Sequence, residues 1–359
     1  MVIGEIIRRN AKRYPNKTAV VCGDSAFTFR EFNERVNSLA NALADLGVRK
    51  GDRIAALLDN CHQYVELYCA SPKSGIVMVP LNYMLSAKEL AFIINNSGAN
   101  TLVLGERYVD TVNSVREDLK GVKHFITTGT STQVMRSYEE LVSKYPPDEP
   151  QAKIDEDDLV YLLYTSGTTG LPKGVMHTHR SMLEIVTQYV ILPGLRKNDV
   201  GLITIPLYWG PSVLFHILPH FYVGSIIVVL KEFGPDAILK AIETEKVSTT
   251  LMPPSFIISL LNHPGLDQYN ISSLRSIVFG GEPMPVEVLK KAVGVFGKIF
   301  AHIYGLMEIT PVTYFSEGDL EVDGPPEVLK RVQSCGKEAV NTEVRVVDEN
   351  DNDVPAGAV

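Results

Sequence analysis

The sequence predicts an α/β protein made of two stacked, doubly wound units, in which parallel-rich sheets are flanked by helices. Three observations support this fold class. Short apolar runs alternate with amphipathic helices over the first hundred residues, the alternation resumes after Asp155, and two capping boxes mark helix starts. Because strand–helix–strand order usually joins parallel strands, each alternating stretch indicates one sheet with helices on both faces.

In the first unit, residues 1–150, two capping boxes locate the helices. Thr28-Phe-Arg-Glu31 opens a helix that ends near Gly47, and Ser86-Ala-Lys-Glu89 opens another. Strands are predicted at residues 53–58, 76–80 and 101–104. No Gly-x-Gly-x-x-Gly follows these strands in the sequence, which disfavours a nicotinamide dehydrogenase.

The second unit is predicted for residues 151–325, after a boundary near residues 144–150 where prolines and charges cluster. Its strands are predicted at residues 160–164, 201–206, 226–230, 249–252 and 274–279, and its helices at 181–190, 236–245 and 254–262. Residues 326–359 are predicted to start a β-rich subdomain. Within them, residues 343–353 resemble a strand that enters an acidic turn without its returning strand, which indicates a truncated chain.

The composition is that of a globular protein, with 45% hydrophobic and 21% charged residues. A net charge of −8 disfavours nucleic acid as the main partner, since phosphate-backbone binding needs a basic surface. The first nine residues carry Glu5 and a basic pair, so they lack the apolar core of a signal peptide and predict a cytoplasmic protein. Peripheral membrane contact and a homodimer stay open. Ordinary core or surface histidines, not metal ligands, are predicted at His177, His179, His216 and His220.

A run rich in hydroxyls and glycines directly follows the apolar segment Leu159–Leu163. It reads Tyr164-Thr-Ser-Gly-Thr-Thr-Gly-Leu-Pro-Lys-Gly174. Glycines let backbone N–H groups approach an anion, Ser and Thr add donors, and Lys173 adds positive charge. A Walker-type P-loop needs Gly-Lys-Ser/Thr at a helix start, whereas Pro172 precedes this lysine. The run therefore predicts a phosphate-binding loop of another kind, with a polar surface turn as the alternative.

Two further motifs follow predicted strands, one at residues 274–279 and one at the apolar run 299–303. Phe279-Gly-Gly-Glu-Pro283 lies at the carboxyl edge, where open α/β sheets bind ligands, although Gly-Gly after a strand is also a common turn. Tyr304-Gly-Leu-Met-Glu308 offers a ring that can stack on a base, a glycine for close approach and a carboxylate suited to Mg²⁺. On these residues alone, a helix-opening turn fits the second motif equally well.

The three motifs resemble signatures of the adenylate-forming superfamily, which includes acyl-CoA synthetases, beetle luciferases and peptide-synthetase adenylation domains. The resemblance covers essentially the whole chain and implies ATP, coenzyme A, Mg²⁺ and a small carboxylic acid as cofactors and substrates. The ATP- or AMP-binding residues that it implies are Thr165, Ser166, Gly167, Thr168, Thr169, Gly170, Lys173, Gly281, Glu282, Pro283, Tyr304, Gly305 and Met307. The implied catalytic residues are Lys173 and Glu308, the implied metal ligands are Glu308 and Thr165, and the implied acyl-binding residues are Tyr208, Trp209, Gly210 and Gly280.

The chain departs from the superfamily pattern at two of these positions. Met307 stands where the motif has a threonine that would contact the α-phosphate, and methionine cannot donate a hydrogen bond. Losing a donor to a charged group costs ~1.5–3 kcal/mol, so we expect catalysis to be slower roughly ten- to hundredfold. Trp209 stands where many relatives carry histidine, so the acyl length cannot be transferred from them, and core packing is the alternative role for this ring.

The resemblance predicts the amino-terminal domain of an AMP-forming fatty-acid–CoA ligase, in which a carboxylate attacks ATP and coenzyme A then displaces AMP. The ribose-binding aspartate and the mobile carboxyl-terminal lid domain, with its lysine, are expected beyond Val359. We therefore expect the 359-residue chain to adenylate weakly or not at all. The alternatives are a nucleotide-binding pseudoenzyme or regulatory module, and an enzyme for aromatic or amino acids. An amino acid is disfavoured because Leu207–Ser212 contains no carboxylate.

Overall fold

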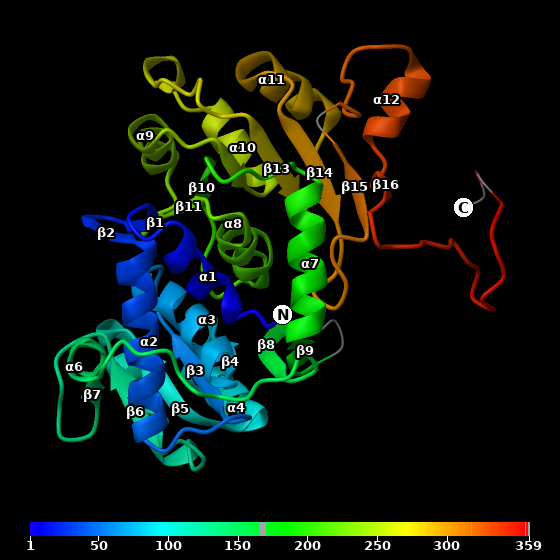
Figure 1. The fold of residues 1–359 in the computed structure, drawn as a ribbon. Helices are drawn as coiled ribbons and strands as arrows, with labels where there is room; N and C mark the ends of the chain where they lie inside the picture. Colours follow the sequence, from blue (N-terminus) through cyan, green and yellow to red (C-terminus); the bar gives the residue numbers. More distant parts are fainter. Residues whose placement is uncertain (166–169, 317, 356, 358–359) are drawn as a thin grey trace.

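A computed structural model describes residues 1–165, 170–316, 318–355 and 357 of the chain. The described residues form two predominantly parallel sheets with helices packed around them, as the sequence predicted. Figure 1 shows the sheets in two halves of the molecule, with α1 and the amino terminus between them. The described part of the carboxyl-terminal segment, red in Figure 1, extends away from both halves.

The first sheet has seven strands in the order β7-β6-β5-β3-β4-β8-β9. Neighbouring strands pair in parallel, except that β8 and β9 pair antiparallel. Its strands are β3 (Arg53–Leu57), β4 (Val77–Pro80), β5 (Ala99–Leu104), β6 (His124–Thr127), β7 (Arg136–Ser137), β8 (Leu159–Thr165) and β9 (Lys173–Thr178).

The second sheet has nine strands in the order β16-β15-β14-β13-β12-β10-β11-β1-β2. The inner strands are parallel, and β2, β15 and β16 add antiparallel pairs at the two edges. Its strands are β1 (Thr18–Cys22), β2 (Ser25–Thr28), β10 (Val200–Ile203), β11 (Ile226–Val229), β12 (Thr249–Leu251), β13 (Ser276–Gly280), β14 (Phe300–Tyr304), β15 (Thr313–Phe315) and β16 (Lys337–Glu338).

The two helices for which the sequence predicts capping boxes begin where the boxes predict. Both capping boxes are formed, at Thr28 with Glu31 and at Ser86 with Glu89. The α-helices are α1 (Glu5–Arg13), α2 (Phe29–Asp45), α3 (His62–Ser74), α4 (Ala87–Ser97), α5 (Val109–Asn113), α6 (Tyr138–Lys144), α7 (His179–Ile191), α8 (Leu218–Val223), α9 (Pro235–Glu245), α10 (Pro254–Leu261), α11 (Val286–Phe296) and α12 (Pro326–Val332). Short 3₁₀ turns lie at Glu106–Tyr108, Arg116–Asp118 and Leu266–Gln268, and a π-helical stretch at Ser212–Ile217 precedes α8.

The two sheets exchange strands across the boundary that the sequence places near residue 150. The β1–β2 hairpin lies among the first 150 residues, yet β1 pairs with β11 in the nine-stranded sheet. Conversely, β8 follows residue 150 and pairs with β4 in the seven-stranded sheet. The division between the sheets therefore differs from the predicted boundary, because pairing depends on which edges lie next to each other in space.

The carboxyl-terminal segment also differs from its predicted form. Residues 343–346 carry no strand, and the predicted hairpin is limited to an isolated antiparallel bridge between Val347 and Asp353. Before it, β16 pairs with β15 and so extends the nine-stranded sheet. A run of residues becomes a strand only when a neighbouring strand takes up its backbone hydrogen bonds. Within residues 318–355, the run at 343–347 has a bridge partner at Val347 alone.

The core confirms that helices cover both faces of the first sheet. Along β3, Ile54 and Ala56 pack in a cluster with α2 and α3, whereas Ala55 and Leu57 pack in another cluster with α4. The larger cluster also contains Leu218 and Phe221 of α8, which lies beside the nine-stranded sheet. One continuous core therefore joins the two halves.

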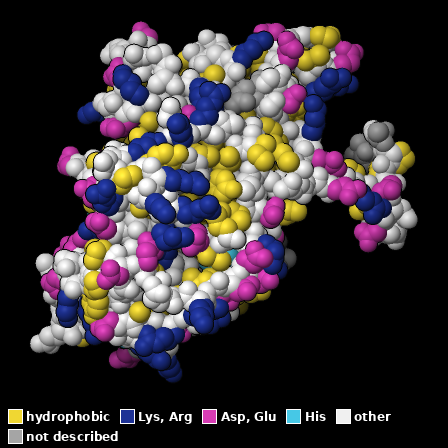
Figure 2. Space-filling view, in the orientation of Figure 1, with side chains coloured by type: hydrophobic (Ala, Val, Ile, Leu, Met, Phe, Trp, Pro, Cys, Tyr) yellow, Lys and Arg dark blue, Asp and Glu magenta, His cyan; other side chains and the backbone are white. Residues whose placement is uncertain are grey.

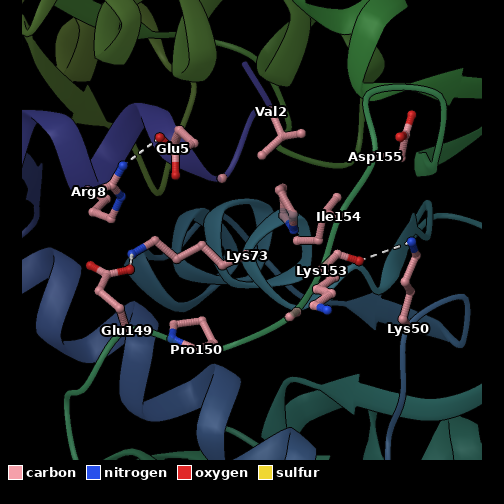
Figure 3. Close-up of a pocket in the computed structure, with 13 residues that line it drawn as sticks. Val2, Glu5, Arg8, Lys50, Lys73, Glu149, Pro150, Lys153, Ile154 and Asp155 are labelled. Atoms are coloured by element: carbon pink, nitrogen blue, oxygen red, sulfur yellow. Dashed lines mark hydrogen bonds and ion pairs between the residues drawn. The ribbon is translucent and has the colours of Figure 1, made fainter.

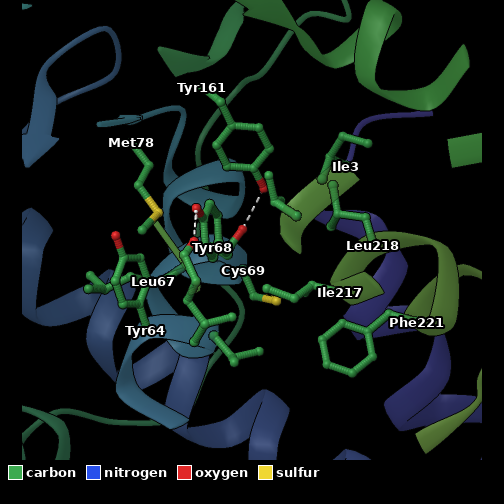
Figure 4. Close-up of a cluster of buried hydrophobic side chains, with 14 of the residues drawn as sticks. Ile3, Tyr64, Leu67, Tyr68, Cys69, Met78, Tyr161, Ile217, Leu218 and Phe221 are labelled. Carbon is green, nitrogen blue, oxygen red and sulfur yellow. Dashed lines mark hydrogen bonds between the residues drawn. The ribbon is translucent and has the colours of Figure 1, made fainter. Parts of the chain in front are cut away.

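Aromatic residues occupy the centre of this shared core. Tyr68 lies edge-on to Tyr161, with ring centroids 5.5 Å apart, and Tyr161 Oη donates a hydrogen bond to the Tyr68 carbonyl at 2.7 Å. Figure 4 shows these rings between α3 and the side chains of Ile3, Leu218 and Phe221. Buried hydroxyls that find a partner let tyrosines occupy a core without leaving an unpaired polar group.

The surface seen in Figure 2 carries basic and acidic side chains interspersed, with apolar side chains gathered over the middle of that face. Within the described residues, no helix is long and apolar enough to cross a membrane.

Candidate active site between the two sheets

The predicted phosphate loop connects two antiparallel strands. Thr165 ends β8, Lys173 begins β9, and the two residues face each other in the register of the hairpin. Strand β9 is absent from the sequence prediction, which places no regular structure between the loop and the next helix. Four of the predicted ATP-binding residues, Ser166, Gly167, Thr168 and Thr169, lie outside the described residues. The exposed Lys173 is thus placed at the base of a hairpin and not at a helix start, unlike the lysine of a Walker-type P-loop.

An apolar cavity of about 280 Å³ lies at the carboxyl edge of the nine-stranded sheet. Residues at or just after the ends of β10, β12, β13 and β14 line it, namely Ile205, Leu251, Pro253, Gly280, Gly281, Ile303 and Gly305. Gly280 is required for close packing of neighbouring strands, because a β-carbon there would lie 2.5 Å from the Ile303 carbonyl oxygen. This edge is where open α/β sheets bind ligands.

A second cavity, of about 340 Å³, lies at the carboxyl edge of the seven-stranded sheet. Pro80 at the end of β4, Asn82 just after it, and residues 163–165 at the end of β8 form one side of it. The segment Tyr208 to Pro211 forms another side. Each sheet therefore contributes one cavity, and the phosphate-loop hairpin borders the second.

The two cavities share three lining residues, Trp209, Pro211 and Met307. Trp209 is 43% exposed, and its ring meets that of Tyr208 edge-on at 6.2 Å between centroids. Trp209 is therefore part of a cavity wall, which decides against the alternative of a purely core role. Met307 also reaches both cavities, although the sequence marks it only as a departure from a motif.

Most of the predicted site residues that the structure describes line these two cavities. The 280 Å³ cavity is lined by Trp209, Gly280, Gly281, Glu282, Gly305 and Met307. The 340 Å³ cavity is lined by Thr165, Tyr208, Trp209, Gly210 and Met307. The remaining described candidates line neither cavity; they are Gly170, Lys173, Pro283, Tyr304 and Glu308. Of these, Tyr304 ends β14 with 45% of its surface exposed, directly beside Gly305.

Glu282 has a partner that the sequence does not reveal. Its carboxylate accepts hydrogen bonds from the backbone N–H and the hydroxyl of Ser255, both at 3.3 Å. Ser255 lies in the first turn of α10, whose exposed N–H groups favour a carboxylate. This contact connects the residue after β13 to the helix after β12.

Asn60 positions the segment that carries Tyr208 and Trp209, and sequence reasoning missed it. The buried side chain accepts a hydrogen bond from Leu207 N at 2.7 Å and donates one to the Ile205 carbonyl at 3.0 Å. Tyr68 Oη adds a bond to the Leu207 carbonyl at 2.8 Å. The only sequence signal was a pair of polar residues, Asp59 and Asn60, immediately after a predicted strand.

His177 lies between the phosphate-loop hairpin and the Met307–Glu308 loop. It is buried on β9, and its Nε2 has no hydrogen-bond partner within the described part of the chain. Burial lowers the pKa of His177, and the Met307 backbone and the Glu308 carboxylate offset part of that shift. The ring therefore packs as a neutral group where β9 meets the loop that holds Glu308.

Across residues 1–165, 170–316, 318–355 and 357, no three His, Cys, Asp or Glu side chains are grouped to hold a metal ion. Glu308 is an exposed single carboxylate. One carboxylate suits a Mg²⁺ ion that takes its other ligands from substrate phosphates and water, as is common for this metal.

A larger cavity, of about 750 Å³, lies away from these motifs, between α1 and residues 149–155. In Figure 3 several of its charged side chains pair with one another or with the backbone. Lys73 contacts Glu149 at 2.7 Å, Arg8 contacts Glu5 at 2.5 Å, and Lys50 donates to the Lys153 carbonyl at 3.1 Å. The Lys73 and Lys50 contacts tie residues 149–153 to the first half, and the Arg8–Glu5 pair lies within α1, so this cavity is the weaker candidate for an active site.

The β8–β9 pair that flanks the predicted phosphate loop, and the two cavities at the sheet edges, fit the adenylate-forming class of enzyme that the sequence motifs resemble. The chain belongs to the AMP-binding enzyme family, whose sequence profile matches residues 7–359. It is similar to a feruloyl-CoA synthase of an Amycolatopsis species, with 31% identity over 97% of this chain and 67% of the relative. It is also similar to a medium/long-chain-fatty-acid–CoA ligase, FadD8 of Mycobacterium tuberculosis, with 26% identity over 99% of this chain and 62% of the relative.

Solved structures agree with this assignment. The anthranilate CoA ligase AuaEII in complex with anthranoyl-AMP superposes with a TM-score of 0.92 at 25% identity, over 100% of this chain and 68% of that chain. The N-terminal domain of FACL13 from Mycobacterium tuberculosis superposes with a TM-score of 0.88 at 25% identity, over 98% of this chain and 86% of that domain. The fold and family are therefore those of AMP-forming acid–thiol ligases, and the chain spans 62–67% of the length of these two curated relatives.

Proposed function

We propose that this chain is the nucleotide- and acid-binding part of an AMP-forming acyl-CoA ligase that acts on an aliphatic or aromatic carboxylic acid. The observation that supports this most strongly is the meeting of the two cavities at Trp209 and Met307. A reaction that joins ATP to a carboxylate needs two substrate-sized spaces with one common point, where the reacting atoms meet.

In this proposal the phosphate-loop hairpin holds the triphosphate. Backbone N–H groups, hydroxyls and Lys173 neutralise negative charge that otherwise repels the incoming carboxylate. Residues 281–283 and Tyr304 hold the adenine, because an exposed ring at a strand end can stack on a base. Glu308 and Thr165 would hold Mg²⁺, which supplies charge neutralisation at the phosphates when bound.

The chemistry proceeds in two displacements. A carboxylate oxygen forms a bond to the α-phosphorus of ATP, the bond from that phosphorus to the bridging oxygen breaks, and pyrophosphate leaves. The sulfur of coenzyme A then forms a bond to the acyl carbon, the thiol loses its proton to solvent, and AMP leaves with the electron pair of the broken C–O bond. Neither step needs a side-chain nucleophile, so the role of this chain is to bind, orient and neutralise charge.

The acid is proposed to be one without an amino group. The relatives include a feruloyl-CoA synthase and fatty-acid ligases, so both aromatic and aliphatic acids are represented. Residues 207–212 carry no carboxylate that could hold an ammonium group. A cytoplasmic location, peripheral membrane contact and a homodimer stay predictions.

A second candidate is a nucleotide-binding protein without catalysis, which Met307 favours because it removes a donor from the motif. Pyrophosphate exchange separates the two. The complete gene product should exchange labelled pyrophosphate into ATP with at least one acid from a panel of short, medium, long and aromatic acids. ATP binding without exchange for any acid would favour the second candidate.

The role of the hairpin is tested in the same assay. Lys173→Ala should slow exchange about tenfold to a hundredfold, which corresponds to one lost charge-assisted hydrogen bond. Lys240→Ala, an exposed lysine on α9, is the matched control and should exchange at the parental rate. Parental exchange by Lys173→Ala would remove the hairpin from the mechanism.

A further inference from the structure

The closed end of the 280 Å³ cavity is apolar. Ile205, Leu214, Phe215, Leu251 and Ile303 line it, and each is at least 94% buried. Leu214 and Phe215 come from the π-helical stretch Ser212–Ile217, which turns the chain into α8 beneath the cavity. Such a lining favours an apolar ligand group, since each buried CH₂ contributes about 0.8 kcal/mol.

The buried part of the cavity lining offers no partner for a second charge. Of the described lining residues, Glu282 alone is ionisable, and its carboxylate is exposed and accepts hydrogen bonds from Ser255. No lysine, arginine or histidine is among the lining residues. An ammonium or second carboxylate on the buried part of a substrate would lose its hydration without compensation, at a cost of several kcal/mol.

The cavity volume limits the size of the ligand group that it can hold. An engineered apolar cavity of about 150 Å³ accommodates benzene, so a cavity of about 280 Å³ accommodates roughly eleven non-hydrogen atoms. One aromatic ring with a short acidic arm fits this limit, as does a saturated chain of about eight carbons. A long fatty acid exceeds it unless a wall moves.

The wall beside the second cavity is formed by Trp209 and Met307. Tyr208 contacts Trp209 edge-on, and Tyr83 contacts Tyr208 edge-on with centroids 4.9 Å apart, so a row of rings supports the indole. Met307 lies against the α-carbon of Gly210, where a side chain would occupy its space. The methionine is the flexible member of this wall and the indole is the supported one.

We propose that the substrate is a carboxylic acid with an uncharged tail of single-ring or medium-chain size, and that Trp209 and Met307 limit its length. This inference rests on the proposed function, because it takes the buried apolar lining of the 280 Å³ cavity as the acid site and assigns Gly281 and Glu282, which line the same cavity, to its boundary with the adenine. Shrinking either wall residue connects the two cavities and admits longer tails.

The test uses non-hydrolysable acyl-adenylate mimics, N-acylsulfamoyl adenosines, titrated into the 359-residue chain by calorimetry. Acetyl, benzoyl, cinnamoyl, octanoyl and palmitoyl forms share the nucleotide and differ in the tail. The cinnamoyl and octanoyl forms should bind at least tenfold more tightly than the palmitoyl form. Trp209, the single tryptophan of the chain, should change its emission when the ringed tails bind.

Met307→Ala and Trp209→Ala should each narrow or reverse that tenfold preference. Ile309→Ala is the control, because Ile309 is an exposed apolar residue of the same loop that lines neither cavity. Palmitoyl binding at least as tight as octanoyl binding in the parental chain would overturn the size limit, and an unchanged preference in both wall variants would overturn the role of the wall. Failure of even the acetyl form to bind, in a chain with a normal thermal melt, would instead contradict the proposed function.

Discussion

Gly210 leaves the space that Met307 occupies. A β-carbon on residue 210 would overlap the sulfur and terminal methyl of Met307, and would approach Leu163 Cδ1 to 3.2 Å. The two residues belong to different predicted motifs, one after β10 and the other after β14. Their contact closes the space between the cavities at the point where the reacting groups are proposed to meet.

Gly210→Ala should therefore destabilise the chain and move Met307. Overpacking of this kind costs about 1–3 kcal/mol, and the flexible methionine places the expected value at the lower end. Urea denaturation measures the loss, and Trp209 emission reports the displaced neighbour. In the double variant Gly210→Ala/Met307→Ala, the second substitution should recover most of the free energy of unfolding lost in Gly210→Ala. If the losses of the two single variants simply add, the two residues do not share this space.

Met307→Thr should increase the rate of pyrophosphate exchange by the complete gene product. A hydroxyl at this position can donate to the α-phosphate, and a donor to a charged group contributes ~1.5–3 kcal/mol, or roughly ten- to hundredfold in rate. Met307→Val is the matched control, with a similar volume and no hydroxyl. Equal acceleration by both variants would attribute the effect to space, and no acceleration by either would show that residue 307 does not limit the rate.

Asn60→Ala should loosen the segment that carries Tyr208 and Trp209. The substitution removes both hydrogen bonds of the buried Asn60 amide, so Leu207 N and the Ile205 carbonyl each lose that hydrogen-bond partner. Each buried group left unpaired costs about 1–3 kcal/mol, so we expect a loss of about 2 kcal/mol or more in urea denaturation.

Asn41→Ala provides the control for that measurement. Asn41 also makes two bonds to carbonyls, those of Pro146 and Asp148, but at the exposed surface where water replaces them. We expect a change within about 0.5 kcal/mol there. Losses of equal size in the two variants would count against a special role for Asn60.

His216 should make stability depend on pH. Burial, and then the neighbouring His220, lower the pKa of His216 to about 3, and neither ring nitrogen has a well-aligned partner among the described residues. Its folded pKa lies below the unfolded value near 6.5, so the unfolded chain takes up the proton first. The stabilisation is therefore complete above pH 6.5 and declines as the pH falls from 6.5 towards 3.

His216→Leu removes this titrating group. At pH 5 its free energy of unfolding should fall less steeply with acidification than that of the parental chain, by about 1.4 kcal/mol per pH unit. Comparison at pH 8 isolates the packing change, because the histidine is neutral there in both states. Identical slopes at pH 5 would contradict the buried, neutral state of His216.

The sequence predicts local structure well because its signals are local. The capping boxes at Thr28 and Ser86 form as expected, since a cap needs only residues three apart in the chain. The motifs after β13 and β14 were placed at one sheet edge from strand order alone, and the structure puts Gly281 and Gly305 on one cavity. Strand ends and turn chemistry carry that information.

The features that the sequence misses depend on contacts between distant residues. Strand β9 is recognisable only once β8 lies beside it, and β1 joins β11 across the whole first unit. Asn60 acts on residues far along the chain, so no spacing rule could mark it. Met307 looks like a lost donor in the sequence, whereas the structure also gives it a place in a wall.

The pairing of β1 with β11 has a consequence for synthesis. Val20 and Val21 lie beside Ile227 and Val228, so roughly two hundred residues must leave the ribosome before β1 meets its parallel neighbour. At ~5–20 residues per second, the nascent chain carries an incomplete sheet edge for about ten to forty seconds. During that interval the β1–β2 ribbon is a segment for chaperones to protect, and slower translation ahead of residue 226 would lengthen its exposure.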